Sequence, residues 1–145
     1  MSDWSFSNIT TLSTPSGTHT FNAAAADTII IDPEASTRTC DLRTTIFKKG
    51  QASGYFYAAP FLQEGQHLVL SGVVRIFSAS TEAAVVAARD VVINDLMTKC
   101  KAILSTEGTL TIGSETLAVR CEQLPIPTGG FLKSVTFGLV STTPM

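Results

Sequence analysis

The fold is decided by residues 71–104, which read SGVVRIFSASTEAAVVAARDVVINDLMTKCKAIL. The first seven of them end a β-branched, apolar run that starts at His67 and predicts a strand over residues 67–77. Such a run is typical of a central strand that is covered on both faces. The Ala- and Val-rich part predicts a helix over residues 81–104, with a length of about 35 Å.

The helix is expected to begin after Ser80, whose hydroxyl can accept a hydrogen bond from a first-turn N–H. Glu82 then lies at the positive end of the helix dipole, and lysines lie near the negative end. Two neighbouring apolar rows have helical spacing: Val85, Ala88, Val92, Leu96 and Ile103, then Ile93, Met97, Cys100 and Leu104. The polar side carries Arg89, Asp90, Asn94, Asp95, Lys99 and Lys101. The pattern predicts a helix lying across a sheet.

The segment after the helix alternates as a hairpin does. Residues 107–124 contain two alternating runs that flank Gly113-Ser114, a two-residue turn signal. Residues 125–130 (Pro-Ile-Pro-Thr-Gly-Gly) indicate a loop, and residues 131–141 predict a closing antiparallel strand.

Short strands are expected before residue 67. Residues 5–12 and 18–21 flank a turn cluster at 13–17, and the apolar run at 28–31 is ended by Asp32-Pro33. The following part predicts a hairpin with strands at 44–47 and 55–57, a turn at 48–50, and a loop at 60–66. We find no repeat or linker and expect one domain over residues 1–145.

The hairpin is unusually aromatic. Phe47 and the Tyr55–Tyr57 run lie beside Lys48-Lys49, a combination that can bind single-stranded nucleic acid. The chain adds no basic stripe, so cross-strand packing is favoured over nucleic-acid binding. A subunit interface is as well supported as core packing, because Tyr and Phe are enriched at buried contacts. The candidate interface residues are Ile46, Phe47, Tyr55, Phe56 and Tyr57.

Composition limits the function. The 145 residues are 44% hydrophobic and 15% charged, with a formal net charge of -2, so the chain as a whole does not attract nucleic acid or anionic lipid. Neither a signal peptide nor a membrane anchor is expected. Cys40, Cys100 and Cys121 are odd in number and widely spaced, which favours buried free thiols over a disulfide.

No pattern in the sequence suggests catalysis. His19 and His67 lack partners at metal-ligand spacing and are interpreted as surface or strand-edge residues. The acidic pair Asp90 and Asp95 is expected on a solvated helix face. We therefore expect no enzyme, no cofactor and no metal.

The ordered elements resemble the N-terminal domain of siphophage distal tail proteins. Six segments carry the resemblance: residues 70–74, 80–84, 107–112, 117–121, 124–127 and 135–140. They cover the chain from His67 onward, about half of it. The resemblance implies an α+β fold, with an antiparallel β-sandwich or split barrel and one long helix packed on the sheet, as in tail-tube proteins.

The resemblance also implies a role in the virion tail. Family members form a ring, expected to be a homohexamer, around a channel through which DNA passes as cargo. The ring joins the tail-tube protein to the tail-tip hub, baseplate or fibre proteins. Close alternatives are a tail-tube ring or a tail-terminator ring. A small ligand-binding module that uses the aromatic hairpin is a further alternative.

The sequence departs from the family in two respects. Many members carry a second, galectin-like domain after the closing strand, and none is expected here. Residues 1–66 match the family poorly, so no ring-forming residue is carried over from it there.

Overall fold

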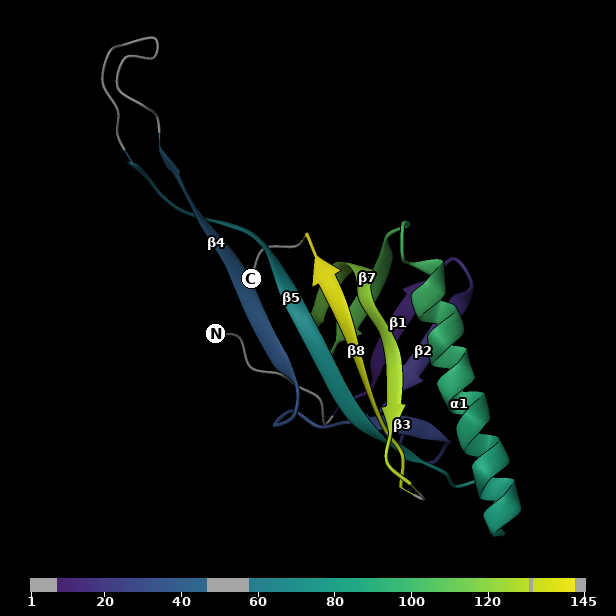
Figure 1. Cartoon of the computed structure of the whole chain (residues 1–145). Coiled ribbons are helices and arrows are strands. Elements are labelled where there is room, and N and C mark those ends of the chain that lie inside the picture. The colour runs from purple at the N-terminus through teal and green to yellow at the C-terminus, as the bar shows by residue number, and fades with distance from the viewer. Residues whose placement is uncertain (1–7, 47–57, 131, 143–145) are drawn as a thin grey trace.

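The computed structural model describes residues 8–46, 58–130 and 132–142. Within them the chain forms eight strands and one helix, arranged as in Figure 1. The elements are β1 (Thr10–Thr14), β2 (Gly17–Phe21), β3 (Thr28–Ile31), β4 (Thr37–Ile46), β5 (Ala58–Arg75), α1 (Glu82–Ala102), β6 (Gly108–Ile112), β7 (Glu115–Thr128) and β8 (Ser134–Ser141). This confirms the predicted α+β class with one long helix.

The strands form an antiparallel, nearly closed barrel. Their order is β2-β1-β6-β7-β8-β5-β3, and β4 pairs with β5 as well. Asn22 bridges the end strands β2 and β3. Its backbone N–H donates to the Ile29 carbonyl at 3.1 Å, and its side-chain oxygen accepts from the Ile31 N–H at 2.9 Å. Asn22 has a φ of 60°, a left-handed conformation that Asn tolerates better than most residues.

The longest strand, β5, holds the barrel together. One edge pairs with β8, and the other pairs first with β4 and then with β3. The change of partner falls at Ser71, whose carbonyl accepts from the Asp32 N–H at 2.8 Å and whose N–H donates to the Ser36 hydroxyl at 3.0 Å. The Ser71-Gly72 pair therefore lies at a junction between strands.

The strand predicted over residues 67–77 is real but longer and less covered than expected. It runs from Ala58 to Arg75, so the loop predicted at 60–66 is wrong. Pro60 is tolerated because it lies at a register irregularity in the ladder with β4, where a missing N–H removes no regular pair. The expectation of two covered faces is also wrong, since Val73 is 43% exposed while Leu68 and Leu70 are fully buried.

The hairpin after the helix is confirmed, with its turn between β6 and β7 at Gly113-Ser114. The loop predicted at 125–130 is partly wrong, because β7 continues to Thr128. Its ladder with β8 shifts register between Gln123 and Ile126, which accommodates Pro125. The closing strand is confirmed as β8, antiparallel to both β5 and β7.

The helix begins one residue later than expected. Thr81, not Ser80, is the N-cap, and its hydroxyl accepts from the Ala84 N–H at 3.3 Å. Arg89 was expected on the polar side but is 7% exposed, because the helix lies against the barrel along that row. No helix among the described residues is both long and apolar enough to cross a membrane.

The core lies between α1 and the inner face of the barrel. Phe21 and Phe137 stack at its centre with their rings 5.7 Å apart, and both are fully buried. Cys100 and Cys121 are buried free thiols, as predicted; the side chain of Cys40 is outside the description. The remaining large, fully buried apolar side chains are Leu12, Ile29, Leu68, Leu70, Leu96, Ile103, Leu110, Leu117 and Leu139.

Candidate functional site

A pocket lies where β2 faces α1, and its polar centre is His19. Alternation along β2 points His19 and Phe21 inward, and their rings meet edge to face at 4.7 Å. Only 5% of His19 is exposed. The prediction of a surface or strand-edge histidine is therefore wrong for His19, because the helix covers the face of β2 that carries this residue. It is confirmed for His67, whose side chain is 36% exposed.

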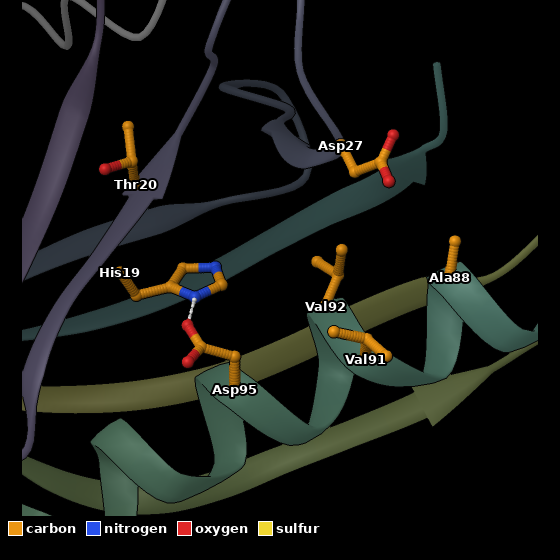
Figure 2. Close-up of a pocket in the computed structure, with 7 residues that line it drawn as sticks. All are labelled: His19, Thr20, Asp27, Ala88, Val91, Val92 and Asp95. Carbon is orange, nitrogen blue, oxygen red and sulfur yellow. Dashed lines mark hydrogen bonds and ion pairs between the residues drawn. The ribbon is translucent and has the colours of Figure 1, made fainter. Parts of the chain in front are cut away.

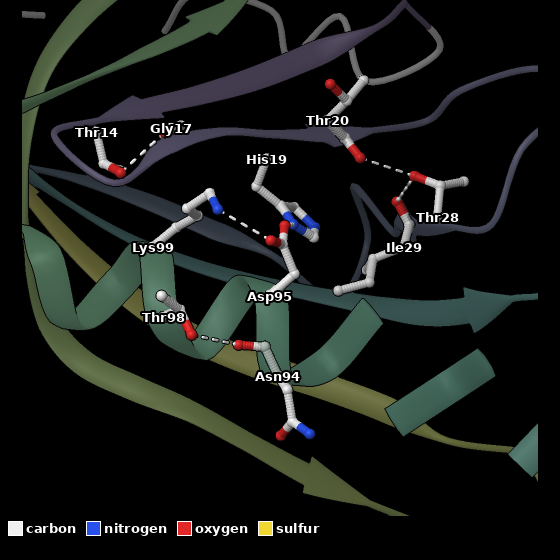
Figure 3. A network of polar contacts seen from close by, with 10 residues as sticks. All are labelled: Thr14, Gly17, His19, Thr20, Thr28, Ile29, Asn94, Asp95, Thr98 and Lys99. Carbon is white, nitrogen blue, oxygen red and sulfur yellow. Dashed lines mark hydrogen bonds and ion pairs between the residues drawn. The ribbon is translucent and has the colours of Figure 1, made fainter. Parts of the chain in front are cut away.

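His19 is tied to the helix by a hydrogen-bond network that includes one ion pair. Its Nδ1 lies 2.7 Å from one carboxylate oxygen of Asp95, and Lys99 Nζ donates to the other oxygen at 2.9 Å. Figure 3 shows this network, with Asp95 between the histidine and the lysine. Asp95 is intermediate in burial, with 43% of its side chain exposed, so it lies at the border of the expected solvated helix face.

Burial sets the protonation state of the pair. It lowers the pKa of His19, against the opposing effect of Asp95. Burial alone would raise the pKa of Asp95, but hydrogen bonds from His19 and Lys99 outweigh it and hold that pKa below its ordinary value. At neutral pH the imidazole is therefore neutral, with the Nδ1 proton donated to the carboxylate. The lone pair is left on Nε2.

The pocket has a volume of about 530 Å³ and is lined by His19, Thr20, Asp27, Ala88, Val91, Val92 and Asp95. Figure 2 shows the second ring nitrogen of His19 turned away from Asp95, toward the side where Val92 and Asp27 lie. This Nε2 atom is buried and has no hydrogen-bond partner among the described residues. A buried polar atom without a partner is uncommon in a stable fold.

Asp27 closes the far side of the pocket. One carboxylate oxygen accepts from the N–H groups of Phe77 and Ser78 at 2.7 and 2.9 Å, and the other accepts from the Ser78 hydroxyl. The bond from the Ser78 side chain is the main reason that the pKa of Asp27 is lowered. Asp27 is thus a fixed anion at an exposed rim.

The site contains part of a catalytic arrangement. A carboxylate that orients a histidine through Nδ1 is the base-and-orienter pair of many hydrolases. The lining residues include neither Ser nor Cys as a nucleophile, and the Thr20 side chain points away from the imidazole in Figure 2. Among the described residues no cluster of three or more His, Cys, Asp or Glu side chains could hold a metal ion.

Sequence reasoning missed this pair. His19 and Asp95 are 76 positions apart, so no local spacing joins them. The available signal was the alternation of His19 with Phe21, which placed the histidine on the apolar face of its strand.

The side chains of the predicted interface residues are not among those that the structure describes. Ile46 ends β4, with its backbone paired to Ala58 and its side chain undescribed. Phe47, Tyr55, Phe56 and Tyr57 lie outside the described residues.

A second hollow of about 350 Å³ lies at one end of the helix, between α1, β3, β5 and Leu132, which precedes β8. Its lining is mainly apolar but includes Arg75 and Arg89. The Arg75 guanidinium donates to the Ala23 carbonyl and lies 4.5 Å from the centre of the Phe77 ring. These contacts explain the position of the Arg75 side chain as part of the packing at this end of the helix.

Comparison with known proteins places the fold but not the family. No protein-family model and no curated protein sequence matches the chain. Among solved structures, the fold is similar to that of Dit from phage SPP1, described as a paradigm of the hub adsorption apparatus in phages that infect Gram-positive bacteria. The two chains are 13% identical and superpose with a TM-score of 0.50.

The extent of this similarity is informative. It covers 94% of this chain and so extends into the part before His67, which matches the family poorly in sequence. It covers 51% of SPP1 Dit, so this chain spans about half the length of that protein. The fold is therefore of the distal-tail-protein type.

Proposed function

We propose that the protein is a structural component of a bacteriophage tail, and specifically a distal tail ring between the tail tube and the tail-tip hub. The observation that carries the proposal is the similarity of the whole described fold to SPP1 Dit. The ring is proposed to be a homohexamer around a DNA channel, contacting the tail-tube protein on one side and hub, baseplate or fibre proteins on the other.

The sheet offers a surface for ring formation. Among the described residues β4 pairs with β5 along one edge, and its other edge faces no strand of the same chain. In Figure 1, β4 and the start of β5 extend well beyond the rest of the barrel. An unpaired edge of ten residues is a template for pairing with another chain, and natural proteins rarely leave one exposed. A ring would cover it.

A structural role without catalysis is part of the proposal. The His19 pocket supplies a base and its orienting carboxylate but no nucleophile among its lining residues. Substrate positioning would need further groups.

Locating the chain along the tail axis tests the proposal. Virions labelled with an antibody to this protein and imaged by electron microscopy should show one band at the junction between tube and tip. Label along the whole tail would instead identify a tube protein, and label at the head-proximal end would identify a terminator. Absence of the chain from purified virions would overturn the tail role altogether.

A further inference from the structure

The His19 pocket combines features that a packing role leaves unexplained. The Nε2 lone pair is buried and unmatched among the described residues, and it lies on the side of the ring that faces the pocket. A buried acceptor without a donor destabilises the folded state, because it has lost its hydrogen bonds to water. A ligand that brings a donor to this atom would recover that free energy.

The charges of the pocket favour a cation. Asp27 and Asp95 both line it, and hydrogen bonds lower the pKa of each, so both are ionised at neutral pH. Lys99 offsets part of the charge of Asp95, but it is not a lining residue. The polar groups that face the pocket are therefore mainly acceptors, and they carry net negative charge.

The apolar wall of the pocket favours a ligand with an aliphatic part. Ala88, Val91 and Val92 form one wall along successive turns of α1 (Figure 2). A volume of about 530 Å³ lies within the range of small-ligand sites. An unbranched alkyl chain would cover this wall while its polar end reaches inward.

We propose that the His19 pocket binds a primary ammonium group on an aliphatic stem. An ammonium group has three rotatable donors and no acceptor, so one donor can reach Nε2 while its charge is stabilised by Asp27 and Asp95, which line the same pocket. Since Nε2 is buried, binding is expected to involve a local movement of the side chains that cover it.

The chemistry has two possible sources: a free amine, or a lysine side chain of another protein chain. The inference does not depend on the tail role. If the chain proved absent from virions, the pocket and its predicted ligand class would be unchanged.

The decisive experiment compares three probes with one stem. The wild-type protein at pH 7.5 is titrated with n-butylammonium, n-butanol and butyrate, while the nitrogen resonances of the His19 ring are followed by NMR. We expect saturable shifts of Nε2 with n-butylammonium, and binding at least about tenfold weaker for the other two. Equal or tighter binding of n-butanol or butyrate, or no shift with any probe, would overturn the proposal.

Two exposed positions on the helix provide matched variants. Val91 is 68% exposed and lines the pocket, whereas Ala87 is exposed and does not. Val91→Lys should abolish n-butylammonium binding, because a tethered ammonium occupies the site, and Ala87→Lys should bind as the wild type does. Both substitutions spare the buried network, so loss of folding is not expected. Unchanged binding in Val91→Lys would contradict the assignment.

A second arm separates the two sources. Self-association is measured by light scattering with and without saturating n-butylammonium. Dissociation of oligomers by the amine, matched by Val91→Lys, would identify a lysine of a second copy as the natural ligand. Oligomers unaffected by the amine would point to a free amine or to a lysine of a different protein. Whether the site exists is decided separately, by the binding titration.

Discussion

At the scale of single residues, His19 and Arg38 are buried ionisable side chains that join distant parts of the chain. His19 is held neutral by burial and oriented by Asp95. The side chain of Arg38 is fully buried. Its two terminal nitrogens form a bidentate ion pair with the Glu115 carboxylate at 2.8 and 2.5 Å, and its Nε donates to the Gln66 side-chain oxygen at 2.6 Å. Each contact joins elements that are distant in the sequence, so each affects folding as a whole.

The pKa of His19 makes stability depend on pH. In the unfolded chain His19 takes up a proton near its ordinary pKa of 6.5. In the folded protein burial lowers the pKa of His19, so protonation requires a lower pH. As the pH falls through 6.5, the unfolded state gains the proton first. The free energy of unfolding should therefore fall, by at most about 1.4 kcal/mol per pH unit for this one group.

Urea unfolding between pH 7.5 and 5.5 measures this dependence, with His19→Gln as the comparison. The variant should lose most of the slope in that window, whatever its absolute stability. A slope that is identical in the two proteins would show that His19 does not titrate as proposed. The other charged groups facing His19 are Asp95 and Lys99. Hydrogen bonds hold the pKa of Asp95 below its ordinary value, so this carboxylate stays ionised in the window.

Loss of Glu115 should be costly. Glu115→Ala removes the carboxylate that pairs with the fully buried Arg38 guanidinium. Because Glu115 is itself 35% exposed, we expect a cost below the roughly 3–5 kcal/mol that is typical of pairs buried on both sides. Glu122→Ala is the matched control, because its pair with His67 is exposed and such pairs contribute about 1 kcal/mol or less. Chemical denaturation gives both values. Similar losses in the two variants would contradict the special role of the buried pair.

At the scale of elements, the junction on β5 determines how the barrel closes. Gly72 allows β3 to cross close to β5: a Cβ placed there would lie 2.6 Å from the Ile29 side chain and 2.6 Å from the Ile30 carbonyl oxygen. Real Cβ atoms do not approach backbone oxygen so closely. The strand that meets Asn22 at the seam is thus positioned by a glycine on its neighbour.

Gly72→Ala should displace β3 and destabilise the fold by about 1–3 kcal/mol, the usual cost of overpacking. Gly130→Ala is the matched control, since a Cβ there meets nothing within 4 Å. Thermal unfolding of the two variants compares them directly. A Gly72→Ala protein as stable as the Gly130→Ala protein would show that β3 can move away at little cost.

At the scale of the whole molecule, assembly is proposed to depend on the β4–β5 hairpin. Deleting residues 48–54 removes its tip and leaves both strands that the structure describes, β4 and β5, intact. We expect the shortened protein to fold but to remain a monomer, whereas the wild type reaches about six times the chain mass of 15.4 kDa. Light scattering coupled to gel filtration measures this, and circular dichroism confirms folding. An unchanged oligomer would exclude the tip as a ring contact.

Local patterns in the sequence determined much of the barrel. The helix, the Gly113-Ser114 turn, the short strands β2 and β3 and the closing strand β8 each follow from alternation, helical spacing or turn chemistry within a few residues. The failures have local causes as well. Pro60 and Pro125 indicated loops, yet irregular ladders absorb both prolines within strands. Arg89 appeared to belong to a solvated face, yet it is buried.

The sequence by itself therefore determined the order and kind of the elements, because hydrogen bonding and side-chain periodicity act over short distances along the chain. Only the tertiary structure decided the site. The pairing of His19 with Asp95, the pocket beside them and the seam at Asn22 depend on how α1 and β3 pack against β2. Contacts between segments that far apart arise from packing of the complete barrel, which no local pattern of residues specifies.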